Sequence, residues 1–163
     1  HCVRNSLHVT LYLSTIMSYQ EKKNIVNIVS SVVITAVYFW FVFRSHPEVG
    51  LATDALLVFW AKTMLWLIPV AIVSKIVIHI AFAILNAIAT REHPPKTDER
   101  DRLIELKATR ITYFTFSLGF LISMIAIASG FSVNVMFVIL VVSGTLSEVF
   151  ENLSQLYFYR RGI

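Results

Sequence analysis

The chain carries four long apolar runs, and this pattern constrains its fold more than any other feature. The runs lie at about residues 24–43, 64–89, 111–128 and 133–158. A helix of about 20 apolar residues crosses the hydrocarbon core of a bilayer, which is about 30 Å thick. A soluble fold of 163 residues leaves too much surface exposed to hide four such runs. We therefore predict an all-α, polytopic membrane protein with four transmembrane helices in a single domain, residues 17–163.

The first 16 residues fit this pattern poorly. Met17 opens a short polar segment with Lys22 and Lys23 just before the first run, which is typical of the start of a membrane protein. We expect residues 1–16 to be upstream or added sequence, disordered or irregular, and a genuine tail is the alternative. A cleaved signal peptide is not favoured, because Leu7–Ile16 is interrupted by polar residues and lacks a small-residue cleavage site.

Lysine and arginine gather beside the ends of the runs. Those predicted on one side are Lys22, Lys23, Arg91, Lys96, Arg100, Arg102, Lys107, Arg110, Arg160 and Arg161. Only Arg44 and Lys62 fall on the other side. The positive-inside rule then predicts an N-in/C-in topology, with the central loop in the cytoplasm. This placement also argues against a nucleic-acid partner, despite the formal net charge of +4, because that needs basic residues on one soluble face.

A charged segment precedes the third run without a helix breaker between them. We predict one continuous helix from about Thr97 to Ala128, so that helix three extends into the cytoplasm. The candidate surface for a cytoplasmic partner consists of Asp98, Arg100, Arg102, Lys107 and Arg110. Two alternatives stay open, since such a segment can bind anionic lipid headgroups or can simply be a solvated helix start.

Ionisable residues inside the second and fourth runs form the candidate buried polar cluster. Lys75 and His79 are four residues apart and share one helix face. Glu148, Glu151 and Asn152 share a face of the fourth helix. Such residues are costly in lipid and usually face protein or water. Three readings remain open: a structural ion pair of Lys75 with Glu148 supported by His79, a cation or proton site, or Glu151 and Lys75 snorkelling to the interface or facing a partner chain.

Small and aromatic residues predict how the helices meet each other and the bilayer. Gly119, Ser143, Gly144 and Ser147 allow close helix approach, either within the chain or at a dimer face. We expect the aromatic residues at the start of the second helix, among them Trp60, to lie along the outer membrane interface.

The segment Asp98–Arg110, of the pattern DERDxxIExKxxR, resembles a signature of a family of small predicted bacterial and archaeal integral membrane proteins of unknown function. The ending Ser154–Gly162 is similar to such proteins as well, and the resemblance covers about residues 90–163. It implies a multi-pass protein of a prokaryotic inner membrane. It implies no activity and no site residues.

No set of residues typical of catalysis stands out in the sequence. The chain lacks an HExxH zinc motif, an intramembrane aspartate pair and a G-x-S-x-G elbow, and its single cysteine, Cys2, excludes a disulfide within the chain. We therefore expect no cofactor, no metal and no enzyme activity. The favoured function is a membrane protein that acts through a protein partner or as a homo-oligomer. The alternative is a small oligomeric cation- or proton-coupled transporter or channel subunit that uses Lys75, His79, Glu148 and Glu151.

Overall fold

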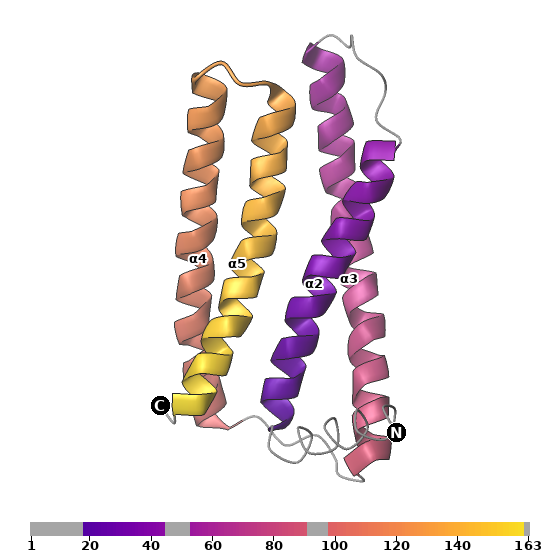
Figure 1. Ribbon diagram of the computed structural model, residues 1–163, viewed down its shortest axis with the longest axis vertical. Helices are drawn as coiled ribbons and strands as arrows, with labels where there is room; N and C mark the ends of the chain where they lie inside the picture. Colours follow the sequence, from indigo (N-terminus) through magenta and orange to yellow (C-terminus); the bar gives the residue numbers. More distant parts are fainter. Residues whose placement is uncertain (1–17, 45–52, 91–97, 162–163) are drawn as a thin grey trace, which may run out of the picture.

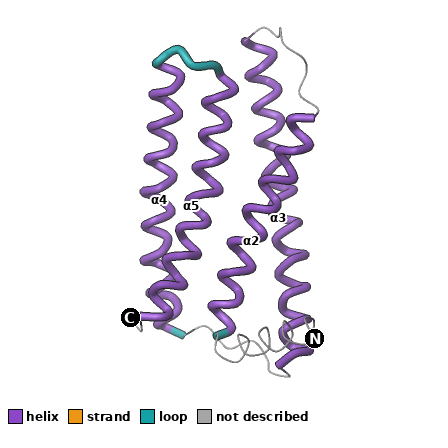
Figure 2. The backbone as a smooth tube through the Cα atoms, in the orientation of Figure 1, coloured by secondary structure: helices purple, strands orange, loops and turns teal. Residues whose placement is uncertain are grey.

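The computed structural model describes residues 18–44, 53–90 and 98–161, and it is helical apart from short connections (Figures 1 and 2). Its elements are α2 (Tyr19–Arg44), α3 (Thr53–Thr90), α4 (Glu99–Ala128) and α5 (Val133–Arg161). All four are long and apolar enough to cross a membrane. Over the described residues, the prediction of an all-α chain with four helices long and apolar enough to span a membrane is confirmed. The expectation for residues 1–16 lies outside the described residues.

Local sequence signals set both ends of α4. Asp98 is the N-cap: its side chain accepts a hydrogen bond from the Glu99 backbone N–H at 2.7 Å, and the Asp98 backbone N–H donates to the Asp101 carboxylate at 3.1 Å. At the other end Gly130 adopts a φ of 84°, a left-handed conformation that glycine takes without strain. Between these two ends α4 is one continuous helix that includes the charged segment, as predicted, and a short turn leads from it into α5.

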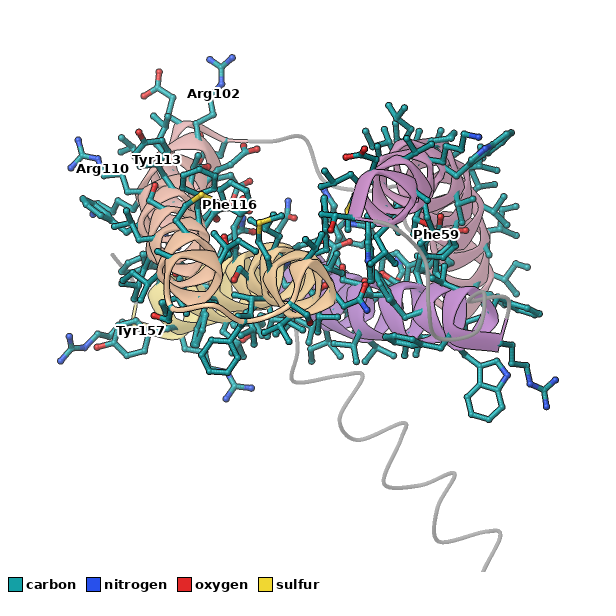
Figure 3. The ribbon with its side chains drawn as sticks, turned by 90° about the horizontal axis from the view of Figure 1, so that it is seen from above. Phe59, Arg102, Arg110, Tyr113, Phe116 and Tyr157 are labelled. Carbon is teal, nitrogen blue, oxygen red and sulfur yellow. The ribbon has the colours of Figure 1, made fainter. Side chains whose placement is uncertain are left out.

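The helices form an open, bent row rather than a closed bundle. Their order in space is α4, α5, α2, α3, and neither α2 nor α3 packs against α4 in the described residues (Figure 1). Seen from above, the row curves so that α3 and α4 face each other across an open side (Figure 3). The first residue of α2, the last of α3, the first of α4 and the last of α5 all lie at one end. We call this the basic end.

The α4·α5 pair makes the closest contact in the molecule. Gly119 of α4 lies directly against Ser143 of α5, and a Cβ atom at Gly119 would overlap the Ser143 side chain. Ile104, Ala108 and Ser123 are also buried along α4. Small residues let two helix backbones approach closely, which increases van der Waals contact where lipid supplies no hydrophobic drive. Gly119 and Ser143 therefore serve packing within the chain.

Trp60 is the α3 side chain that is fully buried in the described residues, whereas it was expected to lie along the outer membrane interface. Its ring stacks on Phe137 of α5 with centroids 5.3 Å apart, and Phe39 of α2 lies on it as well. The indole N–H donates to the Asn134 side chain at 2.7 Å. The ring therefore faces protein, because a polar partner on another helix satisfies the indole there, and its depth relative to the membrane interface stays a prediction. Between residues 64 and 89 no residue of α3 is buried.

Most buried hydroxyl groups bond to the backbone of their own helix. Ser31, Thr63, Ser143 and Ser147 each donate to the carbonyl four residues earlier, at 2.6–2.9 Å. Such bonds satisfy the hydroxyl where no water is present. These four hydroxyl groups therefore require no partner on the neighbouring helix.

Candidate functional site

Lys75 of α3 and Glu148 of α5 form an ion pair across the open side of the row. Both residues lie within the apolar lengths of their helices, where an isolated charge is costly. The pair is incompletely covered, since the two side chains are 30% and 31% exposed. His79, one turn away on α3, forms no hydrogen bond or ion pair with either residue in the described part of the chain. The predicted pairing of Lys75 with Glu148 is thus present without the support expected from His79.

The other polar residues of α5 bind its two neighbours. Glu151 accepts a hydrogen bond from the Thr112 hydroxyl of α4 at 2.9 Å. Asn152 accepts one from the Asn27 amide of α2 at 3.1 Å and donates to the Glu148 carbonyl at 2.7 Å. This face of α5 therefore forms hydrogen bonds with both α4 and α2, and the ion pair of Glu148 with Lys75 connects it to α3 as well.

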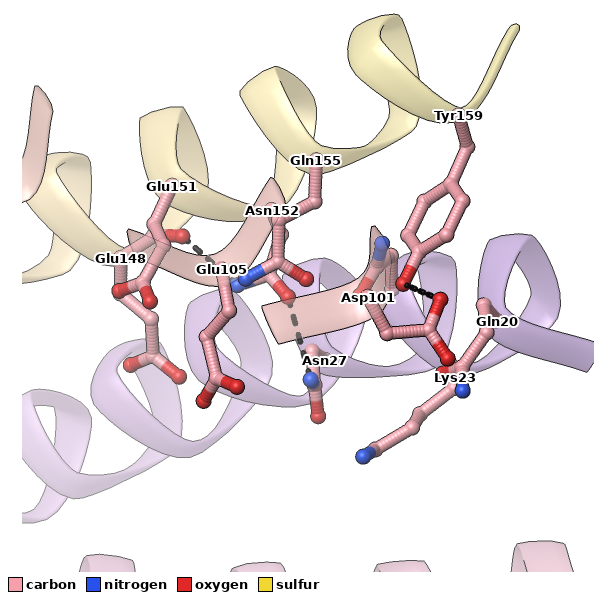
Figure 4. A pocket seen from close by; sticks show the side chains of 11 residues that line it. Gln20, Lys23, Asn27, Asp101, Glu105, Glu148, Glu151, Asn152, Gln155 and Tyr159 are labelled. Carbon is pink, nitrogen blue, oxygen red and sulfur yellow. Dashed lines mark hydrogen bonds between the residues drawn. The ribbon is translucent and has the colours of Figure 1, made fainter. Parts of the chain in front are cut away.

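These residues line a polar pocket of about 240 Å³ between α2, α4 and α5 (Figure 4). The pocket extends from Glu148 to Tyr159, about 16 Å along α5 at ~1.5 Å per residue. At its basic end the Tyr159 hydroxyl donates to Asp101 at 2.8 Å. The polar pocket is lined by Gln20, Lys23, Asn24, Asn27, Asp101, Glu105, Glu148, Glu151, Asn152, Gln155 and Tyr159.

The contribution of α2 and α4 to this pocket was missed in the sequence, although a signal exists. Gln20, Lys23, Asn24 and Asn27 follow the i, i+3, i+4, i+7 spacing of one helix face. Asp101 and Glu105 share a face of α4 in the same way. Residues near a helix start are easily assigned to solvent, and only the packing of α2 on α5 turns this face inward.

A second hollow, which we call the central groove, lies on the open side between α3 and α4. Its volume is about 390 Å³, and Met64, Leu67 and Ala71 of α3 face Phe116 of α4 across it. Gly144 borders the groove, and a Cβ atom there would meet nothing within 4 Å. Glu148 lines both the central groove and the polar pocket, so it lies where the two hollows meet.

The candidate partner surface divides in two. Asp98 caps α4, the Arg100 guanidinium donates to the Tyr159 carbonyl at 3.4 Å, and Lys107 lies over the Phe158 ring at 5.8 Å. Arg102 and Arg110 point away from the other helices (Figure 3). Because α5 continues to Arg161, the charged turns of α4 pack beside it rather than projecting alone.

An ion pair at the basic end joins the start of α2 to the end of α5, outside the apolar spans. Arg160 contacts Glu21 at 3.2 Å, and the Ser18 backbone N–H donates to the same carboxylate at 2.8 Å. Burial alone would raise the pKa of Glu21, but these two donors outweigh it and lower that pKa. The contact therefore favours the charged form of Glu21.

Four apolar helices with an ion pair inside them are the features of a multi-pass membrane protein. Within the described residues, no group of three or more His, Cys, Asp or Glu side chains is placed to hold a metal ion. No family model, no curated protein and no solved structure matches the chain. The resemblance of Asp98–Arg110 to a family of small prokaryotic membrane proteins therefore stays a prediction.

Proposed function

We propose that the chain is a non-enzymatic, multi-pass protein of a prokaryotic inner membrane that acts in an assembly, with its own copies or with another membrane protein. The basic end faces the cytoplasm in this proposal, following the positive-inside rule. Arg102 and Arg110 would then be available there to a cytoplasmic partner or to anionic headgroups.

The observation that carries this proposal is the incomplete cover of Lys75 and Glu148. A charged pair at mid-depth in a bilayer is costly unless protein or water surrounds it. In a single chain the pair borders the central groove, which is open between α3 and α4. A neighbouring chain that covers this groove would separate the pair from acyl tails and would bury the unburied apolar length of α3.

Site-directed photocrosslinking tests the assembly. A Cys2→Ser background with Ala71→Cys, carrying a benzophenone label, places the probe in the central groove. Ile72→Cys is the matched control, because Ile72 lies next in sequence but is not part of the groove lining. We expect a dimer-sized or heterologous adduct in native membranes from position 71 and little from position 72. Reaction with lipid alone at both positions would refute the assembly.

The second candidate function is a small oligomeric cation- or proton-coupled transporter or channel subunit. The position of Glu148 favours it, because this acid lines both hollows and could pass a proton or cation between them. His79 and Glu151 lie on the same two helix faces as the ion pair. Proton and cation flux into liposomes should then be measurable and should vanish in Glu148→Gln while the protein remains folded. Absence of flux in wild-type protein would exclude this function.

A further inference from the structure

The charges in the polar pocket are unbalanced. Four carboxylates line it, those of Asp101, Glu105, Glu148 and Glu151, against one lysine, Lys23. Lys75 neutralises Glu148 from outside the pocket, and no ion pair joins Lys23 to a lining carboxylate in the described residues. The surplus of negative charge favours a positively charged occupant.

A buried donor in the pocket wall lacks a partner. Asn24 is 3% exposed, and its amide nitrogen Nδ2 has no hydrogen-bond acceptor among the described residues. A buried amide left unpaired costs about 1–3 kcal/mol, so such groups normally meet a bound molecule or a water. Asn24 itself lines the polar pocket. The occupant therefore needs an acceptor oxygen in addition to its positive charge.

Size and geometry distinguish an organic cation from a metal ion. The carboxylates are spread along the pocket and do not converge into a metal-ligand set in the described residues. The volume of about 240 Å³ is below the roughly 300–1,000 Å³ of sites for drug-sized ligands, yet it holds several non-hydrogen atoms. These properties fit a small amine.

We propose that the polar pocket binds a primary ammonium compound that carries an acceptor oxygen, with the ammonium on Glu105 and Glu151 and the oxygen on Asn24. A small molecule of this chemistry is ethanolamine, which exists free and as the headgroup of phosphatidylethanolamine. Because the site lies within one chain, it does not depend on the assembly proposed above.

Calorimetric titration of the whole chain in detergent micelles tests the ligand class. Ethanolamine should bind saturably, and ethylamine, which has the ammonium without the oxygen, should bind about tenfold more weakly. In Asn24→Ala the two ligands should bind equally, because the group that distinguishes them is gone. Equal binding of both to wild-type protein, or displacement of ethanolamine by equimolar potassium, would overturn the proposed class.

The location of the site is tested with matched acids on α4. Glu105→Gln should weaken ethanolamine binding about tenfold, whereas Glu99→Gln, which changes an exposed acid outside the pocket, should leave it unchanged. If the natural source is the lipid, wild-type protein in nanodiscs should melt at a higher temperature with phosphatidylethanolamine than with phosphatidylcholine, and Glu105→Gln should abolish that difference. Failure of both free ethanolamine and the lipid to act through Glu105 would overturn the proposal.

Discussion

The α4·α5 pair and α3 show two different ways of holding a membrane helix in place. Along α4 and α5, small residues let the backbones approach, and Gly119 fits against Ser143. α3 carries bulky branched residues and contacts α5 at Trp60 and through Lys75, and α2 at Thr63 and Phe82. The first arrangement distributes contact over the length of the helices, and the second places it at a few separate points. Single substitutions should therefore loosen α3 independently of the α4·α5 pair.

The largest effect is expected at Trp60. Trp60→Ala removes a fully buried ring and its hydrogen bond to Asn134, which should cost about 3–5 kcal/mol and release α3 from α5. Spin labels on α3 and α5 should show a broader distance distribution, while a label pair on α4 and α5 stays unchanged. Trp66→Ala is the control, since Trp66 is 68% exposed. An unchanged α3–α5 distance would contradict the anchoring role.

The next largest effect tests the α4·α5 pair. Gly119→Ala forces a Cβ atom into Ser143 and should destabilise the chain by about 2–3 kcal/mol in reversible unfolding with SDS. Gly144→Ala provides the matched comparison, because its Cβ atom meets open space and alanine favours the helix. Equal stability of the two variants would contradict the close approach of α4 and α5.

A smaller effect is expected at the ion pair. Lys75→Met leaves Glu148 without its counter-charge, which should cost about 1–2 kcal/mol, less than the ~3–5 kcal/mol of a fully buried pair because both side chains are partly exposed. Adding Glu148→Gln to Lys75→Met should restore most of the loss in SDS unfolding. Lys62→Met, at the far end of α3, is the control. Additive losses in the double variant would show that the two residues do not interact.

The smallest effect is expected for Arg160 and Glu21 at the basic end. Arg160→Gln should cost less than about 0.5 kcal/mol at neutral pH, since Arg160 is 69% exposed. The pKa of Glu21 is lowered in the folded chain, so its stabilisation is present above the unfolded value of 4.5 and is lost as the pH falls through the lowered folded pKa. The difference in melting temperature from wild type should therefore shrink as the pH is lowered and disappear once Glu21 is protonated in the folded chain. A difference that does not change as the pH is lowered through this titration would exclude an ionic origin.

The sequence predicted what depends on local patterns. Apolar length located all four helices, and the cap at Asp98 and the glycine in the turn after α4 set the ends of that helix. The pairing of Lys75 with Glu148 was one of the readings that the sequence left open, because opposite charges within apolar spans are less costly when they meet.

The sequence could not predict what depends on the order of the helices in space. From its residue type and position alone, Trp60 is expected at the membrane interface. Its contacts with Asn134 and Phe137 of α5 are seen only in the structure. Asn24 and Glu105 become pocket residues only because α2 and α4 pack on opposite sides of α5. Hydropathy contains no information about which spans are neighbours, so the open side and both hollows required the structure.

The serine and threonine hydroxyls that bond to their own helix have a mechanical consequence. The hydroxyls of Ser31, Thr63, Ser143 and Ser147 need no hydrogen-bond partner on the facing helix. A small sliding or rotation of one helix past another therefore breaks none of their hydrogen bonds. Directional resistance to such shear comes instead from a few cross-links, including Trp60 to Asn134 and Asn27 to Asn152. We therefore expect small shear motions between the helices to be resisted mainly at these separate cross-links rather than along the whole length of the helices.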